Sequence, residues 1–525
     1  MRKITFASLI IIIILFNILI INKEFQNDTF FNIAIGEYIM ENGIDMMDHF
    51  SIHEGLEYTY SHWAFDILIA KTYQVFGFEG IYIFTIIMGA IIGITLFWIL
   101  AKKKMNLMLS FICTIFSLFL IQSGITARSQ IITFLMFILE IYCIEEFLDK
   151  KKLEYLLYLF LISIIIANFH SAVWPMYFIL FLPYIAEYIL KQISFKEENE
   201  RKKKRLKNKI EKLKKKNIGV EKFEKELVIL ENKKFEEKEG YKVLIKNNSN
   251  TKILIIFMVI MILSGLCTPT GLSPYTYIIK SMSGNSINFI NEMQPIIIKD
   301  FPFLIIFILI YITIICFTKV KINMSDGCLF LGLLIMTITS NRYFYLLTLI
   351  GTIPFCRLLN EFIDIYNIDL NKKRYVSVFM VLIIAAGGWF TYINSKTELI
   401  NEKLYPFEVA GYIKENLDVD SMRIYNSYNN GSCLMMYDIP VFIDSRLDVY
   451  CKEFTGREIF DDYVKTTNGF KNYEETFEEY NITHVLTYPD ETISKYICDD
   501  GNYKLIYKDS NDNYCLYERL IKKTF

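Results

Sequence analysis

The chain has 525 residues, of which 53% are hydrophobic and 22% are charged, and its 56 basic and 57 acidic residues leave a net charge of −1. Soluble domains usually carry about 25% charged and about 45–50% apolar residues, so this composition excludes a soluble enzyme and a disordered chain. The near-neutral total also excludes a nucleic-acid binder that depends on overall basicity. Long uncharged apolar runs alternate with short Lys-rich links, which indicates a polytopic membrane protein.

Eleven apolar segments are predicted to span the membrane as helices. A spanning helix needs roughly 20 mostly apolar residues, because each residue adds about 1.5 Å and the hydrocarbon core is about 30 Å thick. The first segment has a longer apolar run than a signal peptide, and no small-residue cleavage site follows it, so we interpret it as a retained anchor. The predicted spans are 4–22, 80–101, 106–122, 130–148, 154–168, 172–190, 253–267, 302–318, 326–341, 343–357 and 376–393.

The distribution of basic residues predicts the orientation of these spans. Basic residues are retained in cytoplasmic links. If Arg2 and Lys3 are cytoplasmic, the alternate links on their side hold 35 basic residues, whereas the links on the other side hold 6. We therefore expect a multi-pass protein of the cytoplasmic membrane, with a cytoplasmic N-terminus and an extracytoplasmic C-terminal domain.

The chain divides into a predicted transmembrane domain, residues 1–393, and a C-terminal domain, residues 394–525, which we call the tail. Strands alternating with helices indicate a sheet covered by helices, and about 130 residues are enough to bury a core. The expected fold class is therefore an all-α polytopic membrane bundle with an extracytoplasmic α/β domain. In the tail, a helix is predicted over 405–417 and strands over 422–425, 441–444, 483–488, 504–507 and 514–518.

A Lys/Glu-rich insertion, residues 191–252, interrupts the transmembrane domain on the predicted cytoplasmic side. Its apolar residues recur at roughly helical spacing from 195 to about 238, with a hairpin expected at Asn217-Ile218-Gly219. The basic run 201–205 is expected to lie near anionic lipid of the inner leaflet. Two interpretations stay open: a solvated insertion without chemistry, or a helix that binds a partner.

The first outer link, residues 23–79, holds three of the five histidines of the chain. Structureless links of this length are uncommon and usually functional. Amphipathic segments at 30–40 and from Trp63 onward are predicted to be helices lying in the membrane interface, apolar side down. Asp28 stands at the start of the first helix, and Asp48 follows the turn after it. We therefore expect the active site in this link.

The polar residues of this link also have structural interpretations. Asp28 is suited to cap the helix that follows it, because an aspartate accepts hydrogen bonds from the free N–H groups of a first turn. Asp48 is similarly suited to close a turn. A metal site is a further alternative, but the spacing of its candidate ligands matches no established pattern. Those candidates are Asp48, His49, His53 and His62.

Other polar residues map to the same side of the membrane. Arg128 opens the fourth predicted span, His170 lies in the turn between the fifth and sixth, and Arg342 lies in the turn between the ninth and tenth. The long link after the seventh span adds Lys280 and Glu292. Any one of these groups could simply extend its charge into interfacial water. Ionisable groups at membrane depth usually face a cavity, so together they predict a polar site at the outer face.

Short motifs in a fixed order, over nearly the whole chain except 195–250, resemble the GT-C superfamily of polytopic glycosyltransferases. The similarity is to an uncharacterised bacterial branch related to the mannosyltransferase-like and lipid A-modifying types. Phe31-Asn32 stand here where that pattern has an aromatic-His pair. The matching segments are Asp28-Thr29-Phe30-Phe31-Asn32, Asp48-His49-Phe50-Ser51, His62-Trp63, Arg128-Ser129-Gln130, Asn168-Phe169-His170, Glu292-Met293-Gln294-Pro295, Asn341-Arg342-Tyr343-Phe344 and Asp444-Ser445-Arg446.

The resemblance implies transfer of a sugar from a polyprenyl-phosphate donor to an acceptor at the outer membrane face. Asp28, with Asp48 as second choice, would be the base that takes the acceptor's proton. Positive charges and hydrogen-bond donors would stabilise the departing lipid phosphate. The residues expected to face that phosphate are Arg128, His170, Arg342 and His62, and a weaker substrate-binding role is expected of Glu292, Lys280 and Trp63.

The resemblance also implies the partners. The acceptor would be a glycan, a lipid or a protein, membrane lipids would surround an apolar groove, and no nucleic acid is expected. No metal site is predicted, although the requirement for a divalent cation stays open. Two alternative functions remain: a flippase or transporter of lipid-linked glycans, for which repeated halves and broken helices are typical, and a catalytically inactive scaffold of envelope assembly, favoured by the missing histidine.

Overall fold

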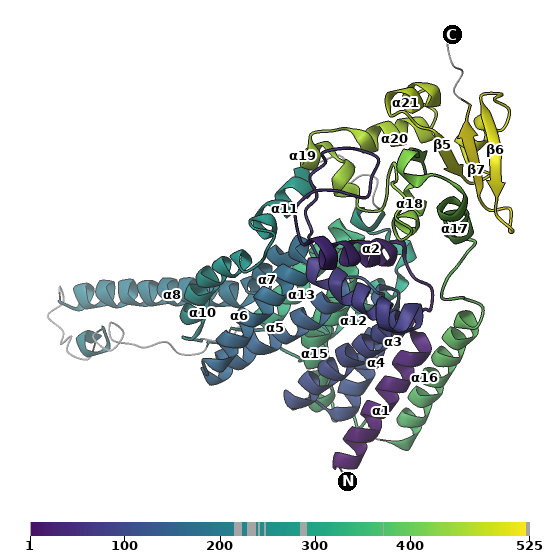
Figure 1. Cartoon of the computed structure of the whole chain (residues 1–525). Helices are drawn as coiled ribbons and strands as arrows, with labels where there is room; N and C mark the ends of the chain where they lie inside the picture. Colours follow the sequence, from purple (N-terminus) through teal and green to yellow (C-terminus); the bar gives the residue numbers. More distant parts are fainter. Residues whose placement is uncertain are drawn as a thin grey trace.

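The computed structural model places a bundle of helices below the tail, with the N-terminus at the end of the bundle that is remote from the tail (Figure 1). It describes residues 2–214, 223–227, 238–239, 242–245, 248–283, 291–370 and 372–520. The helices of the bundle, apart from α2 (Asn27–Asn42) and α11 (Ser273–Ser283), are α1 (Arg2–Ile20), α3 (Trp63–Lys102), α4 (Leu107–Ile121), α5 (Gln130–Lys150), α6 (Glu154–Phe169), α7 (Trp174–Ile179), α8 (Leu182–Lys214), α10 (Thr251–Met261), α12 (Pro302–Phe317), α13 (Met324–Thr339), α14 (Phe344–Ile350), α15 (Thr352–Ile365) and α16 (Lys373–Asn394).

Every predicted span coincides with a helix or a broken pair of helices, because long apolar runs satisfy their backbone hydrogen bonds internally. By length and composition, four helices among the described residues are able to cross a membrane, and a fifth is formed if α14 and α15 count as one span bent by 45°. Five further apolar helices are shorter. The chain is thus a membrane protein by its apolar helices, and the number of its spans stays a prediction.

Two predicted boundaries differ from the structure. The span predicted at 80–101 is the second part of α3, which begins at Trp63 and is broken at Gly77. Gly77 has φ +63°, a backbone conformation that favours glycine, so the chain turns there and then continues as a helix. The span predicted at 343–357 falls on the bend between α14 and α15.

The Lys/Glu-rich insertion begins as a direct continuation of the bundle. Helix α8 runs from Leu182 to Lys214 without a break and extends sideways from the bundle (Figure 1). The hairpin predicted at Asn217-Ile218-Gly219 lies outside the described residues. Toward the end of the insertion, β1 (Lys238–Glu239) and β2 (Val243–Ile245) pair with each other, and β2 pairs with β3 (Ile322–Asn323).

The helix predicted at 30–40 is enclosed. Residues 29–36 of α2 (Asn27–Asn42) are all buried, because the helix lies between the first part of α3 and α18 (Tyr428–Met435) of the tail (Figure 1). Gly36 permits the close approach of α3, since a Cβ atom there would lie 2.1 Å from the carbonyl oxygen of Asp66. The prediction of a helix with one water-facing side is therefore wrong for α2, because the tail covers that side.

The tail contains a four-stranded sheet in the order β4-β5-β7-β6, in which β4 and β5 are parallel and the other pairs are antiparallel. The predicted strand at 441–444 makes only single-residue bridges, from Val441 to Ser51 and Ile424. The elements are α17 (Phe407–Asn416), β4 (Ile424–Tyr425), α18, α19 (Lys452–Thr455), α20 (Ile459–Thr467), α21 (Tyr473–Glu479), β5 (His484–Thr487), α22 (Thr492–Ile497), β6 (Tyr503–Lys508) and β7 (Cys515–Arg519).

The core of the tail includes side chains from the first link of the bundle. Phe31, Ile35 and Ile39 of α2 belong to one hydrophobic cluster with Val409, Phe442 and many other residues of the tail. Burial of apolar area is the main favourable term in such a contact, at about 25 cal/mol per Å². The tail and the first link are therefore packed as one unit on top of the bundle.

Candidate active site

A cavity of about 420 Å³ lies where the bundle meets the tail. Its wall is made by segments that are far apart in the sequence: α2, the start of α3, the start of α5, the turn after α6, α11 (Ser273–Ser283) and the turn before α14. Five residues that the sequence singled out line this one cavity, namely Asp28, His62, Arg128, His170 and Arg342.

Arg128 lies between two carboxylates at the cavity. Its Nη2 atom is 2.6 Å from Oδ2 of Asp28, and its Nη1 atom is 2.9 Å from Oε1 of Glu292. Nη1 also donates a hydrogen bond to Oε1 of Gln26 at 3.2 Å. Burial disfavours the ionised form of Glu292, but the charges of Arg128 and Arg342 outweigh it and lower the pKa of Glu292. These contacts hold the guanidinium of Arg128 in one position at the cavity wall.

Asp28 does not cap its helix. Gln26 occupies the N-cap position of α2, and Asp28 lies in the first turn, where its carboxylate also faces the positive end of the helix dipole. Thr29 beside it is buried and donates a hydrogen bond to the carbonyl of Ala127, at 3.4 Å. This contact holds the start of α2 against the segment that carries Arg128. The capping interpretation of Asp28 is therefore wrong, and its side chain pairs with Arg128 at the cavity instead.

His62 is paired with an acidic side chain behind the cavity wall. Its Nδ1 atom lies 2.9 Å from Oδ1 of Asp66, which is fully buried. Burial disfavours the charged imidazole, but the carboxylate of Asp66 outweighs it and raises the pKa of His62 above its ordinary value of 6.5. His62 therefore adds a positive charge to the cavity below neutral pH.

The His62 charge is expected to stabilise the fold at low pH and to lose this effect as the pH rises. The pKa of His62 is higher in the folded protein than in the unfolded chain, so the contribution is complete below pH 6.5 and is lost as the pH rises through the folded value. The Tm difference between the wild type and His62→Gln, measured by thermal unfolding in detergent, should be larger at about pH 6 than at about pH 9. A difference that grew with pH would contradict this assignment.

His170 contributes an uncharged imidazole to the wall. It is 5% exposed, and its Nδ1 atom lies 3.0 Å from the hydroxyl of Thr133. Burial, together with the positive charges of Arg342, His62 and Arg128, lowers the pKa of His170 well below its ordinary value. His170 can therefore offer a hydrogen bond to an anion, but not a positive charge.

The rest of the cavity is largely apolar. Aromatic and aliphatic side chains of α2, α5, α7, α11 and α14 continue the lining beyond the charged groups. Pockets with an apolar wall and a few convergent polar groups are typical of ligand sites. These side chains are Phe31, Phe134, Phe137, Val173, Met176, Ile278 and Leu346.

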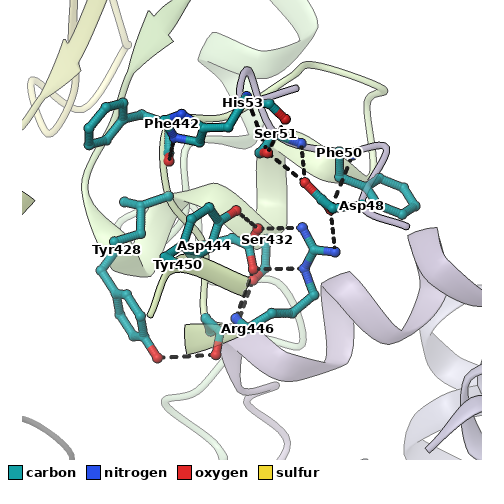
Figure 2. A network of polar contacts seen from close by, with 12 residues as sticks. Asp48, Phe50, Ser51, His53, Tyr428, Ser432, Phe442, Asp444, Arg446 and Tyr450 are labelled. Atoms are coloured by element: carbon teal, nitrogen blue, oxygen red, sulfur yellow. Dashed lines mark hydrogen bonds and ion pairs between the residues drawn. The ribbon is translucent and has the colours of Figure 1, made fainter. Parts of the chain in front are cut away.

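The structure does not bring Asp48, the second-choice base, to this cavity. Its carboxylate is fully buried and lies 2.8 Å from Nη1 of Arg446 in the tail (Figure 2). Burial disfavours the ionised form of Asp48, but Arg446 and the Ser51 hydrogen bonds outweigh it and hold the pKa of Asp48 below its ordinary value. The ion pair between Asp48 and Arg446 therefore joins the first link to the tail. The Asp48 carboxylate contacts neither solvent nor the cavity.

The four candidate metal ligands of the first link take separate partners. His49 pairs with Asp45, and His53 bonds through Nε2 to the carbonyl of Phe442 at 2.8 Å. Asp48 pairs with Arg446, and His62 pairs with Asp66. No group of three or more His, Cys, Asp or Glu side chains in the described part of the chain is arranged to hold a metal ion.

Three weaker candidates lie around the cavity. The carboxylate of Glu292 pairs with Arg128, which lines the cavity. Trp63 donates a hydrogen bond from Nε1 to the side-chain oxygen of Asn168 at 3.1 Å, which ties the start of α3 to the end of α6. Lys280 lies on α11 with its Nζ atom 5.8 Å from the ring of Phe454 in the tail. These contacts are structural, and none of the three residues lines the cavity.

Asn32 and Tyr277 are two of the lining residues that were not predicted as site residues. Asn32 follows Asp28 by one helical turn, so both side chains lie on one face of α2. It is 2% exposed, and its Oδ1 atom has no hydrogen-bond partner among the described residues. The departure at Phe31-Asn32 from the family pattern was the available signal for it. Tyr277 of α11 gave no signal, because aromatic residues are frequent throughout this chain.

Comparisons with known proteins support the fold and leave the activity open. No family model and no curated protein matches the chain. Two structures of the Archaeoglobus fulgidus oligosaccharyltransferase are similar to it. The form tethered to an acceptor peptide through a disulfide bond has a TM-score of 0.53 and 11% identity, covering 93% of this chain and 69% of that one. The apo form has a TM-score of 0.53 and 12% identity, and the match covers 92% of this chain and 69% of that one. The chain therefore has a fold similar to that of this oligosaccharyltransferase.

Proposed function

We propose that the protein is a membrane glycosyltransferase that moves a sugar from a polyprenyl-phosphate donor to an acceptor at the outer face of the cytoplasmic membrane. The observation that carries this proposal is the convergence of Asp28, Arg128, His170 and Arg342 on one cavity with an apolar continuation. The archaeal oligosaccharyltransferase of similar fold holds an acceptor peptide, which supports the same class of reaction here.

In this proposal the cavity supplies both kinds of charge that the reaction needs. The acceptor hydroxyl loses its proton to Asp28 while its oxygen attacks the anomeric carbon, and the bond from that carbon to the phosphate oxygen breaks. A single displacement of this kind inverts the anomeric centre. Polyprenyl phosphate leaves with the electron pair, and Arg128 and Arg342 stabilise its negative charge.

The contacts of Arg128 suit this role. Arginine can bond two phosphate oxygens at once, because its guanidinium presents a planar fork of N–H donors. With two carboxylates beside it, Arg128 stays positively charged and in one position before the donor binds. His170 adds a neutral donor, and the apolar lining accommodates the first isoprene units of the lipid.

Among the described residues, the acidic and histidine side chains at this cavity do not form a ready set of ligands for a divalent cation. Asp28 and Glu292 are both engaged by Arg128, and His62 is engaged by Asp66. The proposed mechanism therefore routes no step through a metal ion and assigns the stabilisation of charge to the two arginines.

Purified protein in liposomes is expected to transfer radiolabelled sugar from short-chain polyprenyl phosphates to a glycan, lipid or protein acceptor from the cell envelope. The labelled lipid-linked sugar should be consumed with release of polyprenyl phosphate, measured by thin-layer chromatography. Movement of the intact donor across the bilayer without cleavage would instead identify a flippase, and neither cleavage nor movement would identify an inactive scaffold.

A further inference from the structure

A short segment of the tail, residues 444–450, is fixed to the first link of the bundle. Arg446 of this segment is 3% exposed, and its guanidinium bonds to Asp444 at 2.7 and 2.9 Å and lies 2.8 Å from Asp48 (Figure 2). Tyr450 donates a further hydrogen bond to Asp444. The rings of Phe50 and Tyr58 lie 5.2 and 4.9 Å from the guanidinium. The segment is therefore held rigidly.

The same segment reaches the cavity wall on its other side. The carboxylate of Asp448 lies close to the hydroxyl of Tyr277 on α11, and burial together with this negative charge raises the pKa of that hydroxyl. Phe454 follows a few residues later, and its ring lies 5.3 Å from the ring of Tyr277. The Nζ atom of Lys280 lies 5.8 Å from the ring of Phe454. Because Tyr277 and Lys280 are three residues apart, they face the tail from one side of α11.

Helix α11 also contributes to the wall of the cavity. Tyr277, Ile278 and Ser281 line it, so Tyr277 belongs both to the wall and to the contact with the tail. Asp448 lies beside its hydroxyl and does not line the cavity, so the aromatic ring is the part of Tyr277 that we assign to the ligand. The electron-rich face of an aromatic ring attracts the polarised C–H groups on the apolar face of a sugar ring.

We propose that Tyr277 is the wall against which the sugar of the donor packs, and that the tail, through Asp448 and Phe454, positions this wall. The proposal rests on the proposed function, because it takes a lipid-linked sugar to be the ligand of the cavity. It assigns the tail a role in sugar recognition, with Tyr277 contacting the ligand and Asp448 acting as a positioning residue.

The test measures the binding of two lipids to the full chain in nanodiscs: a polyprenyl phosphate carrying a sugar, and the same polyprenyl phosphate without it. Tyr277→Leu should weaken binding of the glycosylated lipid about 3- to 10-fold and leave binding of the bare lipid unchanged. Tyr277→Phe and Asp448→Asn should each cause a smaller loss, and the double variant should lose no more than either one alone.

Asp490→Asn, which changes an exposed carboxylate elsewhere in the tail, is the matched control and should bind both lipids as the wild type does. The inference is overturned if the wild type binds both lipids and Tyr277→Leu weakens both equally or neither. A wild type that binds neither lipid would instead overturn the proposed function, and the inference with it. Additive losses in the double variant would remove Asp448 as the residue that positions Tyr277.

Discussion

Replacing Asp28 by asparagine is expected to lower the turnover of sugar transfer by about 10²- to 10⁴-fold, with little change in the affinity for the donor. The amide keeps the shape of the side chain but cannot accept the proton of the acceptor hydroxyl. Arg128 retains its contact with Glu292, so the guanidinium stays in place for the donor phosphate. The measurement is the rate of product formation at saturating donor, together with donor binding.

The matched control for this variant is Asp300→Asn, which changes an exposed carboxylate in the link after α11. It should have wild-type turnover and wild-type binding. If Asp28→Asn keeps full turnover while it is folded, as judged by gel filtration and Tm, Asp28 is not the base. A loss of donor binding equal to the loss of turnover would instead assign Asp28 to binding.

The largest effect on stability is expected from Arg446→Gln. Removing one partner of a buried ion pair leaves uncompensated charge, which typically costs about 3–5 kcal/mol. Here two buried carboxylates, Asp48 and Asp444, would lose their common partner (Figure 2). The change should lower the Tm strongly and expose the junction between the tail and the first link to limited proteolysis.

Arg457→Gln provides the comparison for this substitution, because Arg457 is an exposed arginine of the same domain. Its Tm should stay close to that of the wild type. Equal Tm values for Arg446→Gln and the wild type would mean that the buried ion cluster does not hold the tail in place, and the role of the segment 444–450 would fall with it.

Sequence alone was able to predict the charged part of the site for a physical reason. Charges are scarce at the outer ends of the predicted spans, so the few that occur there, such as Arg128 and Arg342, stand out and are expected to share a polar cavity. Asp28 was selected by its place in a family-like motif. The structure brings these three residues together with His62 and His170.

The residues that sequence reasoning misplaced depend on distant partners. Asp48 lies in a motif that looks catalytic, yet its partner Arg446 is 398 positions away in the tail, and no local pattern announces the pair. The same holds for α2, whose expected water-facing side is covered by α18. Hydrophobic periodicity describes which faces are apolar, but it does not specify which later segment will cover them.

A density map of the protein with a short-chain polyprenyl phosphate sugar bound would test the central claim most directly. The phosphate should lie within hydrogen-bond distance, about 3 Å, of both Arg128 and Arg342, with the sugar beside Asp28 and the lipid chain along the apolar lining. A phosphate bound elsewhere, or a cavity that stays empty at saturating lipid, would contradict the account.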